Sequence, residues 1–125
     1  MPSQSPDISP PSISVNGRIV EASGQTDLPD GARMDFTAIR GIGDLSLTES
    51  SSIVSHGRYD VVFDLTDWVP GEYVLWVEFW PGHLQSKAIE DKYGADGSKM
   101  SGGRVRNEPD STELEWFGAY DFDLK

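Results

Sequence analysis

The chain contains no cysteine and only two histidines among its 125 residues. The absence of cysteine excludes disulfides, thiolate nucleophiles and cysteine-based zinc sites. Neither His56 nor His83 belongs to a recognisable catalytic constellation, because no G-x-S-x-G nucleophile elbow accompanies the serines. We therefore predict that the protein is not an enzyme and uses no cofactor.

Basic residues are scarce: 10 lysines and arginines stand against 21 acidic residues, and the net charge is −11. Such a surface repels phosphate groups, which argues against nucleic acid and anionic membranes as partners. No apolar run approaches the roughly 18 residues of a membrane span, so we expect no membrane insertion. The first residues also lack the basic and apolar regions of a signal peptide, so we expect an exported form to begin after its cleavage point.

Proline and serine are concentrated at the start of the chain. Residues 1–12 hold four of each, a composition that favours extended, unpacked geometry. We predict a flexible tether over residues 1–12 and a single β-sandwich domain over residues 13–125.

Apolar and polar residues alternate through much of this domain. Residues 59–65 and 73–79 carry a bulky apolar side chain at every second position, and Met34, Phe36 and Ala38 repeat the pattern. Period-two alternation predicts strands that each bury one face. We expect the first two runs to form a hairpin or to lie next to one another.

Turn signals separate these runs, notably Asn16-Gly17 and Pro70-Gly71. Strands with this spacing predict an all-β fold, an immunoglobulin-like antiparallel β-sandwich of about seven strands. Within the long connection at residues 81–109 we expect one short helix, starting after Ser86 and ending at Gly94.

Three motifs resemble those of bacterial immunoglobulin-like domains. They are G-x-T-x-L-P-D-G at residues 24–31, G-x-Y at residues 57–59 and P-G-x-Y-x-L-x-V at residues 70–77. The last is also typical of transthyretin-like sandwiches. The resemblance implies an exported, surface or lipoprotein-like setting, outside the cell or in its envelope, and no catalysis. It supplies no functional residues.

The tryptophans are the candidate ligand-binding residues. Trp76 and Trp80 fall on the face of their strand opposite the apolar stripe, and Trp68 lies in the preceding turn. Exposed indoles would stack on sugar rings or anchor a protein. We favour the alternative that the 81–109 connection folds back over them, because this explains both the long connection and the tryptophans.

No metal site is predicted. The acidic stretch at residues 91–97 departs from the EF-hand pattern, because Lys92 and Gly94 occupy ligand positions and Gly103 stands where a glutamate is needed. The remaining alternative is a calcium ion held by carboxylates from separate loops, at Asp27, Asp30, Asp67 and Asp96.

The sequence thus predicts an acidic, non-catalytic module of the cell surface or envelope, with a structural or protein-interaction role. Two alternatives remain: a carbohydrate-binding module that uses its tryptophans, and a self-assembling subunit that donates residues 7–15 to a neighbour's sheet. We expect a protein or polysaccharide partner and a monomer or weak oligomer.

Overall fold

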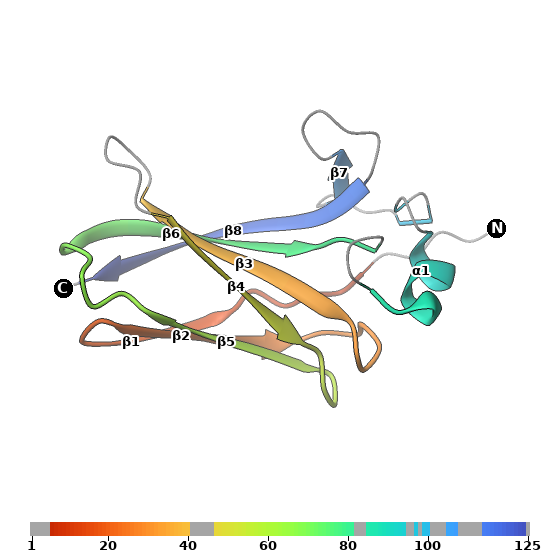
Figure 1. Ribbon diagram of the computed structural model, residues 1–125, viewed down its shortest axis with the longest axis horizontal. Helices are drawn as coiled ribbons and strands as arrows, with labels where there is room; N and C mark the ends of the chain where they lie inside the picture. The colour runs from red at the N-terminus through yellow and green to blue at the C-terminus, as the bar shows by residue number, and fades with distance from the viewer. Residues whose placement is uncertain are drawn as a thin grey trace.

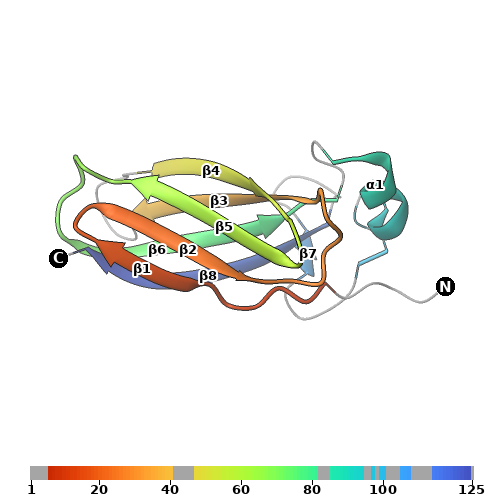
Figure 2. The same cartoon turned by 90° about the horizontal axis from the view of Figure 1, so that it is seen from below.

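The computed structural model describes residues 6–40, 47–81, 85–94, 97, 99–100, 105–107 and 114–124. In these residues the chain forms eight strands in two antiparallel sheets that face each other (Figures 1 and 2). One sheet has the order β1 (Ser12–Asn16), β2 (Ile19–Gln25), β5 (Arg58–Asp64). The other has the order β4 (Leu47–Ile53), β3 (Arg33–Arg40), β6 (Gly71–Phe79), β8 (Leu114–Leu124), β7 (Val105–Asn107). The predicted all-β sandwich is confirmed.

The alternating stripes form the core between the sheets. Every apolar residue of the stripes at 59–65 and 73–79 is buried, as are Met34, Phe36 and Ala38. The two sheets meet at Phe36 and Tyr59, whose ring centroids lie 5.8 Å apart. Period two therefore assigned the inner faces of β3, β5 and β6 correctly.

The expected pairing of residues 59–65 with residues 73–79 is wrong. Strand β5 pairs with β2, whereas β6 pairs with β3 and β8 in the opposite sheet. The connection between β5 and β6 crosses from one sheet to the other, and Trp68 within it packs on Tyr73 with ring centroids 5.1 Å apart. Arg18 fixes this crossing, because its Nε donates to the Trp68 carbonyl at 2.9 Å.

Residues 6–12 of the predicted tether lie against the domain. Ile8 is only 6% exposed and belongs to the core. The Ser9 amide donates to the Gln25 carbonyl at 2.9 Å, and the Tyr59 hydroxyl donates to the Ser9 carbonyl at 2.6 Å. One apolar side chain and a few backbone hydrogen bonds thus attach a proline-rich segment whose composition indicates an unpacked chain. Residues 1–5 lie outside the described residues.

The predicted short helix is confirmed as α1 (Lys87–Tyr93), which begins after Ser86 and ends at Gly94. It lies at one end of the sandwich (Figure 2). Its buried residues are Ile89 and Tyr93, and Tyr93 meets Phe79 edge-on at 5.2 Å between ring centroids. None of the helices in the described part of the chain has the length and apolar character needed to cross a membrane.

Two buried tyrosines make the free energy of unfolding depend on pH in the alkaline range. Burial raises the pKa of Tyr59 to about 12, against the opposing hydrogen bond to Ser9, and burial together with the charge of Asp27 raises the pKa of Tyr93 to about 12. An unfolded tyrosine loses its proton near pH 10. The unfolded state therefore binds fewer protons between pH 10 and 12, and the free energy of unfolding falls as pH rises through this window.

Urea unfolding midpoints measured across the alkaline range check this dependence. Tyr59→Phe removes one of the two titrating groups, so its stability is expected to fall less steeply with pH than that of the wild type. Identical slopes for the two proteins would contradict the assignment.

Candidate functional site

The outer face of the five-stranded sheet carries the candidate site. Its composition follows from the register, because residues opposite one another on neighbouring strands point to the same face. One row across the sheet holds Glu49, Thr37, Trp76 and Ala119. The next holds Ser51, Asp35, Glu78 and Phe117.

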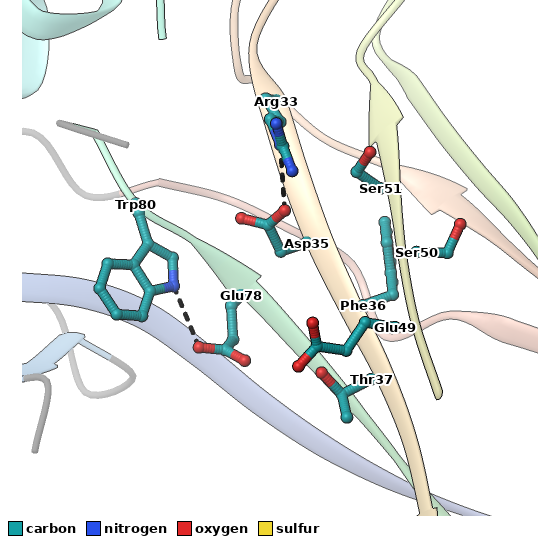
Figure 3. A pocket seen from close by; sticks show the side chains of 9 residues that line it. All are labelled: Arg33, Asp35, Phe36, Thr37, Glu49, Ser50, Ser51, Glu78 and Trp80. Atoms are coloured by element: carbon teal, nitrogen blue, oxygen red, sulfur yellow. Dashed lines mark hydrogen bonds and ion pairs between the residues drawn. The ribbon is translucent and has the colours of Figure 1, made fainter. Parts of the chain in front are cut away.

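A pocket opens on this face over β3, β4 and the end of β6, with a volume of about 450 Å³. Its volume falls within the range of small-molecule sites. Figure 3 shows its lining, which we call the outer-sheet pocket: Arg33, Asp35, Phe36, Thr37, Glu49, Ser50, Ser51, Glu78 and Trp80.

Two carboxylates of the pocket face each other across neighbouring strands. Asp35 lies directly opposite Glu78, an arrangement of like charges that destabilises a sheet. Each has a donor of its own: Arg33 Nε lies 3.1 Å from Asp35 Oδ1, and Trp80 Nε1 donates to Glu78 Oε2 at 3.0 Å (Figure 3). These contacts hold both carboxylates in place and leave their other oxygens available for a ligand.

Thr37 contributes a hydroxyl that opens onto the pocket. The residue is 7% exposed, and the exposure it keeps is on the pocket side, since it lines the pocket. Within the residues that the structure describes, no side chain or backbone group forms a hydrogen bond with this hydroxyl. A hydroxyl that opens onto a pocket and has no protein partner is a good position for a ligand hydrogen bond.

Gln85 fixes the end of the pocket where β3 begins. Its side chain accepts from the Arg33 amide at 2.8 Å and donates to the Arg33 carbonyl at 2.7 Å, as a neighbouring strand would. It also donates to the Trp80 carbonyl at 3.0 Å. One amide side chain thus sets the spacing between Arg33 and Trp80 on opposite walls.

The structure separates the three tryptophans that were the candidate ligand-binding residues. Trp76 and Trp80 lie on the outer face and are half-buried, and Trp76 packs edge-on against Phe117 with centroids 5.8 Å apart. Trp68 instead packs against the core through Tyr73, so it does not share a surface with the other two.

The predicted cover of these tryptophans stays a prediction, because much of the 81–109 connection, including residues 82–84 and 101–104, lies outside the described residues. Burial does show that the outer face is covered on the side of the sheet formed by β8 and β7. Glu115 on β8 points to this face and is 0% exposed, with Arg106 of β7 opposite in the register. The alternation along β8 accounts for the direction of Glu115 but not for its burial. The open part of the face is therefore the side toward β3 and β4.

A second hollow of about 510 Å³ lies where residues 7–9 meet the start of β5. Two of its polar side chains already bind backbone amides of the fold. Asp27 Oδ1 accepts from the Asp7 amide at 2.9 Å, and Ser9 Oγ accepts from the Gln25 amide at 2.8 Å. The Asp27 carboxylate and the Ser9 hydroxyl thus hold residues 7–9 against the sandwich.

The histidine and aspartate candidates lie mainly in turns. Ser55 Oγ lies 2.9 Å from His56 Nδ1, but both are exposed neighbours in one turn, and no carboxylate of the described residues orients the ring. Asp30 Oδ1 accepts from the His56 amide at 2.8 Å. No group of three or more potential metal ligands occurs in the described ranges, while His83 and Asp96 lie outside them.

Comparisons with known proteins bear on the fold alone. No protein-family model matches this chain, and no curated protein matches it. The structure is similar to a part of OgpA from Akkermansia muciniphila, with a TM-score of 0.54 and 12% sequence identity. The similarity covers 98% of this chain and 28% of OgpA. At this identity the likeness supports the sandwich fold and carries no activity over to this chain.

Proposed function

We propose that this protein is a non-catalytic binding module of an extracellular or cell-envelope protein and that the outer-sheet pocket is its binding surface. The observation that carries the proposal is the set of fixed polar groups at Asp35, Thr37 and Glu78, which open onto one pocket beside Trp80. Such convergence of a few polar groups in a preformed concavity is the general form of a ligand site.

The unfavourable contribution of these groups to folding stability supports a binding role. Asp35 and Glu78 repel each other across the sheet, and the Thr37 hydroxyl has no protein partner in the described residues although only 7% of the residue is exposed. Sequences depart from local stability rules mainly at functional sites. The absence of cysteine and the poorly supported Ser55–His56 pair favour binding over catalysis.

The setting rests on the resemblance to bacterial immunoglobulin-like domains and on the net charge of −11. The self-assembly alternative gains no support from the structure, because Ser12–Asn16 pairs with β2 of its own chain and Ile8 forms a bridge with Thr26. A strand donated to a neighbour would first have to leave these positions.

A fragment screen followed by NMR tests the location of the binding surface. We expect amide shift changes from a library of small polar and aromatic fragments to concentrate on β3, β4 and the end of β6. Asp35→Asn is expected to weaken the best fragments about three- to tenfold, because a charged acceptor is lost. The matched control Asp60→Asn, on the outer face of the other sheet, leaves their binding unchanged. Shift changes centred on Asp27 and Arg58, or scattered over the domain, would overturn the proposal.

A further inference from the structure

We infer that the outer-sheet pocket binds a neutral oligosaccharide. This inference rests on the proposed function and names its ligand class. Three features carry it: the mixture of hydrogen-bond donors and acceptors in the pocket, the Trp80 indole on one wall, and the negative charge that disfavours acidic ligands.

Donors and acceptors alternate within the pocket. The Arg33 guanidinium only donates, the carboxylates of Asp35 and Glu78 only accept, and the Thr37 hydroxyl does both. A sugar hydroxyl is itself both donor and acceptor, so neighbouring hydroxyls of a sugar ring can satisfy such a set together. Hydrogen bonds from hydroxyls to fixed carboxylates are charge-assisted and stronger than neutral ones.

One wall of the pocket is formed by Glu78, which lies opposite Asp35, and by the indole of Trp80, which directly follows β6. Trp76 lies opposite Thr37 on the same outer face, beside the pocket lining. The bond from Trp80 Nε1 to Glu78 fixes the indole, so little side-chain freedom is lost when a ligand binds. A pyranose ring has a face of C–H groups, which suits the electron-rich face of an indole, and a rim of hydroxyls, which suits the polar residues of β3.

The charges favour a neutral ligand over an acidic one. With a net charge of −11 the protein repels acidic sugars and nucleic acids. A neutral polyol avoids this repulsion. The pocket itself holds the Arg33 guanidinium against the carboxylates of Asp35, Glu49 and Glu78, so a basic peptide is the competing ligand that the hexalysine probe tests.

Isothermal titration calorimetry on the full chain tests the inference with defined probes. The neutral probes are cellohexaose, xylohexaose, mannohexaose and chitohexaose, and the charged probes are a galacturonic acid hexamer and hexalysine. We expect saturable binding of at least one neutral probe, with an affinity that added salt leaves nearly unchanged. Thr37→Val keeps the side-chain shape and is expected to weaken that binding about three- to tenfold. Its matched control, Thr66→Val in an exposed turn, is expected to bind like the wild type.

The outcomes separate this inference from the proposal on which it rests. Binding of hexalysine alone would replace the sugar with a basic peptide and overturn the inference. Failure of all four neutral probes, with fragments still marking the pocket, would overturn the inference and leave the binding surface standing. A neutral probe that binds Thr37→Val as tightly as the wild type would place the sugar elsewhere and overturn it as well. Urea midpoints of both threonine variants confirm that they are folded.

Discussion

Replacing Phe36 with alanine is expected to lower the free energy of unfolding by about 3–5 kcal/mol. Phe36 is 0% exposed at the centre of β3, and its ring stacks on Tyr59 of the opposite sheet. Truncation removes the contact that joins the two layers and leaves a cavity that β-sheet backbones close poorly. Urea or thermal unfolding followed by circular dichroism measures the loss.

Phe117→Ala provides the matched control on the same sheet. Phe117 lies on the outer face, is half-buried, and packs edge-on against Trp76. Its truncation is expected to cost about 1 kcal/mol, since a half-buried ring on the outer face encloses little volume when it is removed. Equal losses for the two variants would mean that the inner and outer faces of the five-stranded sheet have been assigned wrongly.

The contrast between these phenylalanines shows how much of the fold the sequence predicts. Side chains alternate strictly along a strand, so the residues around Phe36 indicate its inner face without any knowledge of its partners. Pairing is different, because it depends on contacts between residues far apart in the sequence. Residues 59–65 and 73–79 have matching patterns and a short connection, yet they lie in opposite sheets. Nothing in the local pattern distinguishes a hairpin from a crossing between layers.

The candidate site is predictable to the same degree. The alternation on β6 places Trp76 and Trp80 on the outer face, and the structure agrees. The partners of Trp80 in the pocket come from β3, and only the register brings Asp35 opposite Glu78. Nothing in the sequence indicates a role for the Thr37 hydroxyl, because outward-facing threonines are common in strands and burial cannot be read from the sequence.

A second large loss of stability is expected at Gly24, a glycine that lies within strand β2 and not in a turn. Gly24→Val should lower the free energy of unfolding by about 2–3 kcal/mol, although valine favours strands more than glycine does. Gly24 lies opposite Tyr59, and a Cβ at this position would come within 2.6 Å of Tyr59 Cζ. The ring has no free direction in which to move, because it stacks on Phe36 and its hydroxyl holds the Ser9 carbonyl at 2.6 Å. Chemical denaturation measures the effect, and Ser23→Val in the same strand is the control, with a change within about 0.5 kcal/mol.

A double-mutant cycle shows whether the Tyr59 ring is the cause. In a Tyr59→Leu background the clash is gone, so Gly24→Val is expected to cost less there than in the wild type by about 1–3 kcal/mol.

The Gly24→Val and Ser23→Val variants also probe the attachment of the N-terminal segment. The displaced ring releases the Ser9 carbonyl, and amide exchange at Ser9 is then expected to speed up in Gly24→Val but not in Ser23→Val. If Gly24→Val is tolerated as well as Ser23→Val, the ring does not fill this space.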